Sequence, residues 1–286
     1  MPRRNVFWKT LRDQRWQIIG FGLAMAVMAA AAVWLWPSAR DTLQNFKVPP
    51  AIQALLGSDL DLSTAAGYLS GRYFSWTIIL VLVYVIMAGT AAIAGEEGAG
   101  TMDLLLAQPV SRTQVIAEKF AATAVGAVAI VGLGYVGFVV SIPTVDIDVA
   151  LGDAAIASAN MVPIALMFFT LSLWAGAAAP SRGMAAGAVI GIVTMAYFLY
   201  TLSNGVESLR WMRYATPFYY YGSGLPLIRG IEWWHAGLLT GLAVVFLAMS
   251  VRMFERRDIA SGNGELNLRL LLSGRARVPA VQPTGE

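Results

Sequence analysis

Residues 73–94 read YFSWTIILVLVYVIMAGTAAIA, a run of twenty-two residues without a charged side chain. A helix needs about 20 consecutive apolar residues to cross the roughly 30 Å hydrocarbon core of a bilayer. The run has that length, and a core helix of a soluble domain would carry a polar face. The stretch therefore predicts a membrane-spanning helix.

Five further uncharged stretches have a similar length, and together they predict an all-α integral membrane protein with six transmembrane helices. They cover residues 17–36, 120–142, 154–179, 183–206 and 233–251. Only Pro180, Ser181 and Arg182 separate the fourth stretch from the fifth. We therefore expect a tight turn between two antiparallel neighbours.

The composition agrees with this interpretation and excludes several classes of protein. Hydrophobic residues make up 57% of the 286 residues and charged residues 13%, against about 25% charged residues in soluble domains. The absence of cysteine excludes disulfides and cysteine-bound metals, and the single histidine excludes a His-rich metal site. None of the three lysines follows a glycine, so the chain has no G-x-x-x-x-G-K-[ST] loop for ATP phosphates.

The distribution of basic residues predicts how the spans are oriented across the membrane. If connections alternate between the two sides, 14 of the 20 basic residues lie on the side of both termini. The charged residues of the connection between the third and fourth spans are all acidic; they are Asp146, Asp148 and Asp153. Cytoplasmic loops and tails of membrane proteins carry an excess of lysine and arginine. We therefore expect a protein of the bacterial inner membrane with both termini in the cytoplasm.

Residues 5–16, before the first span, have an amphipathic pattern. Phe7, Trp8 and Leu11 share one face, and Lys9, Arg12 and Asp13 lie opposite. The pattern favours a helix that lies in the membrane interface. The alternative is an ordinary positively charged flank of the first span.

The segment after the second span, residues 94–112, has the most informative pattern. Gly95, Gly98 and Gly100 are expected to end the second helix, and Thr101 to cap a short helix with leucines on one face. Pro109 would stop that helix, and Ser111 with Gln114 forms a capping box for the next one. A leucine face on a cytoplasmic helix must meet another protein or the membrane surface.

The chain resembles the permease subunit of ABC-2-type transporters of the bacterial exporter type. The resemblance is carried by residues 95–112, between the second and third of six spans, which follow the order G-E-E-x-x-G-T-x-D-L-L-L-A-x-P-V-S-R. The resemblance covers most of the chain, including the interfacial (elbow) helix and a Pro-aromatic segment before the last span. It implies that the segment carries a coupling helix that docks onto a separate ATP-binding subunit. It also implies short re-entrant helices that cover the outer end of the pathway.

By this resemblance, ten residues would form or position the docking element, and four aromatic-segment residues would line an outer gate. The docking residues are Glu96, Glu97, Gly100, Thr101, Asp103, Leu104, Leu105, Pro109, Ser111 and Arg112. The gate residues are Pro217, Phe218, Tyr219 and Tyr220. The alternatives are that the glutamates are solvated charges, that Thr101 is only a cap, and that the tyrosines belong to an interfacial aromatic belt.

Two rival classes of protein require residues that can be checked in the sequence. A glutamate-pair membrane protease needs E-E-x-x-x-R, but Thr101 stands at the arginine position, and a rhomboid protease needs G-x-S-G, but Tyr221 precedes Gly222, Ser223 and Gly224. An enzyme is thereby disfavoured. A passive channel or scaffold is the remaining alternative, although no charged residue lies inside the spans to form a filter.

The sequence therefore predicts a non-catalytic permease subunit in two parts: a transmembrane domain over residues 1–260 and a cytoplasmic tail over residues 261–286. The expected partners are two ATP-binding subunits, a second copy of the chain and the bilayer, but no nucleic acid. The chain itself would bind no cofactor or metal, since ATP and Mg²⁺ would be held by the partner. The expected direction of transport is export.

Overall fold

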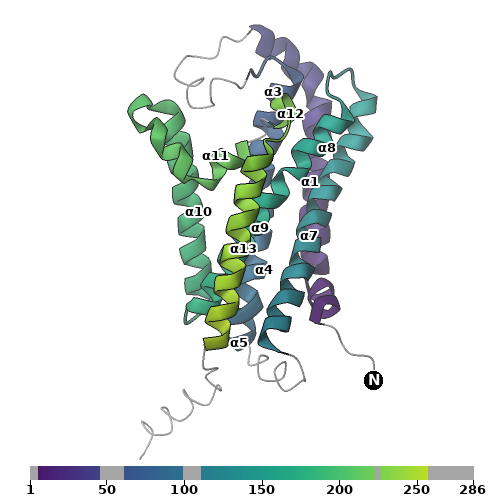
Figure 1. Cartoon of the computed structure of the whole chain (residues 1–286). Coiled ribbons are helices and arrows are strands. Elements are labelled where there is room, and N and C mark those ends of the chain that lie inside the picture. Colours follow the sequence, from purple (N-terminus) through teal and green to yellow (C-terminus); the bar gives the residue numbers. More distant parts are fainter. Residues whose placement is uncertain (1–5, 46–60, 99–110, 223–225, 257–286) are drawn as a thin grey trace, which may run out of the picture.

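The computed structural model describes residues 6–45, 61–98, 111–222 and 226–256, and it confirms an all-helical architecture in those ranges (Figure 1). Six helical stretches there are long and apolar enough to cross a membrane. They cover Val6–Leu43, Ala65–Gly95, Arg112–Thr144, Leu151–Ala178, Arg182–Gly205 and Trp233–Glu255. Each predicted span lies within or closely overlaps one of them.

The first span belongs to α1 (Val6–Asn45), which also contains the predicted amphipathic segment. We expected that segment as a helix of its own, but the structure shows no interruption between it and the span. The reason is that no glycine or proline occurs in α1 before Gly20, so nothing in the sequence ends the helix. Pro37 lies inside α1.

The second span is one helical path with two π segments. Its parts are α3 (Ala65–Leu69), η1 (Ser70–Phe74), α4 (Ser75–Thr90), η2 (Ala91–Gly95) and α5 (Glu96–Gly98). The prediction that Gly95 ends the helix was therefore wrong. Gly95 instead lies within a π turn, which accommodates one extra residue without breaking the helix.

The third span is α7 (Arg112–Ser141), followed by the short η3 (Ile142–Thr144). The fourth was predicted as one helix, but Asn160 separates α8 (Leu151–Ala159) from α9 (Met161–Ala178). Pro163 explains the break, because it has no N–H to donate to the carbonyl of Ala159 four residues earlier.

The remaining elements follow the predicted order. A turn through Ser181, whose hydroxyl accepts from Met184 N–H, leads into α10 (Arg182–Gly205), as expected. The connection before the last span folds into η4 (Glu207–Ala215), α11 (Pro217–Tyr221) and α12 (Pro226–Arg229). The sixth span is α13 (Trp233–Arg256).

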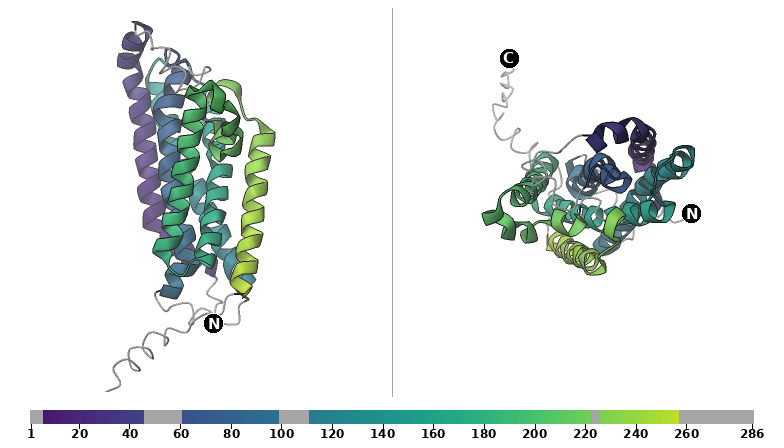
Figure 2. Two further views of the ribbon diagram at one scale, coloured as in Figure 1. Left: turned by 90° about the vertical axis from the view of Figure 1, so that its left-hand side faces the viewer. Right: turned by 90° about the horizontal axis from the view of Figure 1, so that it is seen from above.

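The helices are arranged around α4 and α9. We call the end where α1 begins and α13 ends the terminal end; it is the lower end in Figure 1. Figure 2 shows, from above, α10 at one side of the bundle and the α1–α7 pair at another. The fourth span (α8 and α9) is the most enclosed, since 67% of its most apolar part is buried within the protein. The fifth span (α10) is the least enclosed, since only 11% of its most apolar part is buried.

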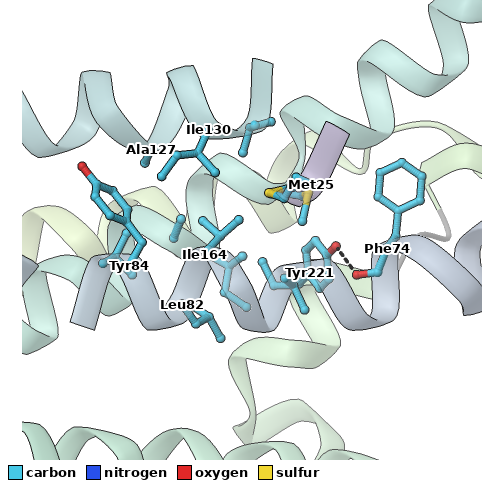
Figure 3. Packing of buried hydrophobic residues seen from close by; sticks show 14 of the residues in the cluster. Met25, Phe74, Leu82, Tyr84, Ala127, Ile130, Ile164 and Tyr221 are labelled. Carbon is cyan, nitrogen blue, oxygen red and sulfur yellow. Dashed lines mark hydrogen bonds between the residues drawn. The ribbon is translucent and has the colours of Figure 1, made fainter. Parts of the chain in front are cut away.

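The core is held by close helix contacts as well as by large side chains. Figure 3 shows Tyr84, Ile130 and Ile164 packed together from α4, α7 and α9. Gly137 lets α7 approach α1 closely, because a Cβ built there would lie 2.3 Å from the carbonyl oxygen of Ala26. Small residues are the usual means by which membrane helices come into contact.

We predict that Gly137→Val lowers the stability of the folded bundle by about 1–3 kcal/mol, the usual effect of overpacking. Gly132→Val is the matched control, since it lies on the same helix and a Cβ there meets nothing within 4 Å. Thermal unfolding in detergent would measure both. Equal unfolding temperatures for the two variants would contradict the close-contact role of Gly137.

Candidate functional site

The predicted docking residues that the structure describes lie at the terminal end, in α5 and at the start of α7. Glu96 begins α5, Ser111 caps α7, and Arg112 is the first residue of α7. Glu97 belongs to α5, but its side chain lies outside the described part. The other predicted docking residues also fall outside the described residues; they are Gly100, Thr101, Asp103, Leu104, Leu105 and Pro109.

The carboxylate of Glu96 is engaged within the chain. Its Oε2 lies 2.7 Å from Nζ of Lys119 in α7, and its Oε1 lies 3.8 Å from Nζ of Lys9 in α1. The Lys119 ammonium also donates to the carbonyl oxygen of Ala92. As a predicted docking residue Glu96 was expected to face a second subunit, whereas here its carboxylate joins three helical segments of one chain.

Lys119 was missed as a site residue. Its side chain is only 4% exposed, and it lies inside α7, one residue before the predicted span of residues 120–142. A signal was present, because Val115 and Ile116, one helical turn earlier, are also buried and place position 119 on the same face. Lys119 directly precedes the uncharged run of residues 120–142, so α7 carries this charge at the edge of the run and not inside it.

Ser111 caps α7 as predicted, while the other half of the capping box differs. The Ser111 hydroxyl accepts from Gln114 N–H at 3.1 Å. The Gln114 amide, expected to return to Ser111, instead donates to Oε1 of Glu118 at 2.8 Å. Glu118 Oε2 accepts from Phe7 N–H at 3.0 Å, so a carboxylate of α7 satisfies a donor at the start of α1.

Arg112 binds the end of α13. Its Nη1 donates to the carbonyl oxygen of Phe254 at 2.8 Å, and its guanidinium lies 5.4 Å from the centre of the Phe254 ring. The neighbouring Thr113 hydroxyl donates to Glu255 Oε1 at 2.8 Å. A cation at the last carbonyls of a helix satisfies free acceptors and opposes the negative end of the helix dipole.

A small apolar cluster lies beneath these polar contacts and joins five elements at the terminal end. Its buried members come from α1, η2, α7, α9 and α13; they are Val6, Ile93, Val115, Ile116, Leu173, Ala177 and Phe254. The start of α7 and the exit of the second span are therefore both packed against this cluster. Displacement of either one would disturb the other.

At the opposite end, α11 carries the predicted gate residues. Phe218 is buried against Phe168 and Tyr197, with ring centres 5.9 and 5.2 Å apart. Pro217 begins α11. Tyr219 and Tyr220 are half-buried and contact the His235 ring on the first turn of α13, at 5.5 and 5.2 Å. The aromatic segment thus connects α9, α10 and α13.

Asn160, which sequence reasoning missed, and Tyr221 anchor this segment. The Asn160 side-chain amide donates to the carbonyl oxygen of Tyr221 at 2.8 Å. The Tyr221 hydroxyl donates to the carbonyl oxygen of Phe74 at 3.1 Å, as Figure 3 shows. An amide side chain in an otherwise apolar run was the available signal for Asn160.

The outermost tyrosines have opposite electrostatic surroundings. A hydrogen bond from the Arg213 guanidinium, 2.8 Å long, lowers the pKa of Tyr214. Burial raises the pKa of Tyr219, its neighbour in the same aromatic cluster. A separate cavity of about 450 Å³, wide open to the surface, lies between α10 and the end of η4, and apolar residues such as Met195 and Leu199 line it.

The comparison with protein families decides what this bundle is. Residues 4–259 match the model of the ABC-2 family transporter proteins. The chain belongs to the ABC-2 transporter family. The comparison with curated proteins finds no match.

Membership in the ABC-2 family makes the chain a membrane component of an ABC transporter, and the family implies an ATPase partner. The match includes α1, all six spans and the segment between α5 and α7, and confirms the resemblance inferred from residues 95–112. Within the part of the chain that the structure describes, no group of three or more His, Asp or Glu side chains could hold a metal ion.

We predict that Arg112→Ala loosens the last turn of α13, at a cost of about 0.3–2 kcal/mol for a lost cation at a helix end. Hydrogen exchange of the amides of residues 251–256 should become faster. Arg252→Ala is the matched control, because Arg252 is an exposed arginine on α13 itself. Unchanged exchange in Arg112→Ala would show that the contact does not hold the helix end.

Proposed function

We propose that the chain is the permease subunit of an ABC-2 exporter. Two copies would form the translocation pathway between them and couple to two ATP-binding subunits, which hold ATP and Mg²⁺. The observation that carries the proposal is the segment between Gly98 and Ser111. It belongs to an ABC-2 chain, it carries leucines in a helical pattern, and both helix ends beside it are tied to the bundle by ion pairs and hydrogen bonds.

In this mechanism, ATP binding closes the two ATP-binding subunits, and the docked segment moves with them. The movement enters the permease through α5 and α7, which flank the segment. Because α7 is bound to α13 through Arg112 and to α1 through Glu118, the helices of the terminal end move together. Hydrolysis resets the arrangement, and the permease itself supplies no chemical catalysis.

The proposed orientation of the chain in the membrane follows from the distribution of charge. If connections alternate, 14 of the 20 basic residues lie on the side of both termini, so we place that side in the cytoplasm, at a bacterial inner membrane. The exposed Asp146 and Asp148 lie at the opposite end, facing outward. In this orientation Tyr219 and Tyr220 cover the outer end of the pathway.

The face of α10 is the proposed contact with the second copy. Three glycines, Gly183, Gly187 and Gly191, recur at four-residue intervals, and a Cβ at any of them meets nothing within 4 Å. Lipid-facing helices have no need of such a glycine row, whereas closely packed membrane helices use it. The apolar cavity beside Gly191 would then lie between the two copies, which suits an apolar or amphipathic substrate.

Purification tests the coupling to an ATPase. From mild detergent the chain should bring an ATP-binding subunit with it, and the double variant Leu105→Asp and Leu106→Asp should lose that subunit while still inserting into the membrane. Charged groups in a leucine face oppose its burial against a partner. The matched control is Val206→Asp with Trp211→Asp, two exposed apolar residues at the opposite end.

Retained association in the leucine variant would contradict the docking role of the segment. Absence of any ATPase subunit in the parent preparation would favour the alternative of a channel or scaffold that is not driven by ATP.

Cysteine cross-linking tests the α10 face, and the chain has no native cysteine to interfere. Gly187→Cys should form a disulfide-linked dimer in membranes under mild oxidation, because cysteines at a close helix crossing come within disulfide reach. Leu23→Cys, on an exposed face of α1, is the control and should remain monomeric on a gel. Dimers from the control alone would assign the contact to α1 instead.

A further inference from the structure

Lys119 is the most deeply buried charge in the described part of the chain. Its side chain is 4% exposed, against 21% for its partner Glu96 and 46% for Lys9. A buried ammonium is unfavourable unless it is paired and hydrogen-bonded. Here the Glu96 carboxylate at 2.7 Å and the carbonyl oxygen of Ala92 supply both kinds of partner.

The two partners of Lys119 lie on the last turns of the second span. Ala92 belongs to η2, and Glu96 is the first residue of α5. One ammonium therefore holds both sides of the turn that contains Gly95. It does so from α7, the helix that begins where the docking segment ends. The contact connects the two ends of the segment without passing through it.

Neighbouring contacts make this point a junction of three helices. Glu96 reaches Lys9 on α1 with its second oxygen, and Glu118, which adjoins Lys119 in sequence, accepts from the N–H of Phe7. The Lys119 side chain is buried, whereas that of Lys9 is about half exposed. Screening by water and salt weakens an exposed pair far more than a buried one.

We propose that Lys119 is a positioning residue of the transporter: its pair with Glu96 fixes the direction in which the chain leaves α5 and transmits movement of the docking segment to α7. The inference rests on the docking role proposed above. Stability alone does not account for the residue, because apolar side chains of similar volume commonly replace buried ion pairs at no loss. A directional pair is suited to hold one geometry.

The η2 turn explains why the contacts of Lys119 with Glu96 and Ala92, here called the lock, are needed at this place. A π turn and Gly95 together make the exit of the second span a weak point in the helix. Force applied to the segment beyond Gly98 would bend this turn before it moved α4. The Lys119 ammonium spans the turn, so the force passes directly into α7.

Spin labels measure the lock without any partner subunit. Gly98 and Arg252 are exposed at the terminal end, and the absence of native cysteine allows Gly98→Cys and Arg252→Cys to be labelled specifically. The label-to-label distance should have a narrow distribution in the parent chain. In Lys119→Met the distribution should broaden, because α5 is no longer held to α7. Lys119→Arg, which keeps the charge and the donors, should restore the narrow distribution.

Lys9→Met is the matched control, since it removes the same charge from the same carboxylate at an exposed position. It should leave the distribution narrow. A narrow distribution in Lys119→Met, or equal broadening in Lys9→Met, would overturn the proposal. If Lys119→Met is not recovered folded, Glu96→Gln takes its place: a broadened distribution supports the lock, and an unchanged one refutes it.

The complex provides the second readout. With its ATPase bound, Lys119→Met should still hydrolyse ATP, but the movement that ATP produces between labels on Gly98 and Arg252 should be lost. Loss of ATPase association in Lys119→Met would instead assign Lys119 to docking and overturn the positioning role. If no ATPase joins even the parent chain, the proposed function fails, and the label distances of the isolated chain still decide whether Lys119 holds α5.

Discussion

The hydrocarbon interior supplies no water to the backbone, and every irregularity of this bundle has to be satisfied from within. The break at Asn160 and the π turn at Ser70–Phe74 are such irregularities. A short relay links them, in which Asn160 donates to the Tyr221 carbonyl and the Tyr221 hydroxyl donates to the Phe74 carbonyl. These two contacts place α11 against both the break at Asn160 and the π turn.

Charged side chains at the terminal end also need partners within the bundle. Lys119 is tolerated within α7 because Glu96 and a backbone carbonyl meet it there. Arg112 is less buried and binds free carbonyls at the end of α13. Scarce polar groups thus join helices that apolar packing alone would leave free to slide, since apolar surfaces have little preference for one another over lipid.

Much of the architecture was predictable because span length is set by membrane thickness. The six uncharged runs, the turn at Ser181 and the cap at Ser111 follow from local sequence, and the structure confirms them. The continuity through Gly95 and the break near Pro163 were not predicted, because neighbouring helices decide whether a glycine or proline interrupts a helix.

The candidate site was predictable only in part. The segment of residues 95–112 identified the family, and the family model agrees. The burial of Lys119 depends on helix register and on the position of Glu96 across a helix contact, and neither can be read from a count of charges along the chain. The docking roles of Leu104, Leu105 and their neighbours stay predictions, since those residues lie outside the described ranges.

The start of α1 has a practical consequence for anyone who purifies or images this protein. Phe7 is bound to Glu118, and α13 ends beside Arg112, so both ends of the described chain emerge at the terminal end. An affinity tag or fluorescent fusion joined directly to Val6 or Arg256 would crowd the surface on which an ATPase is proposed to sit. The loop at residues 145–150, with Asp146 and Asp148 exposed at the opposite end, is the better site for an epitope or an antibody fragment.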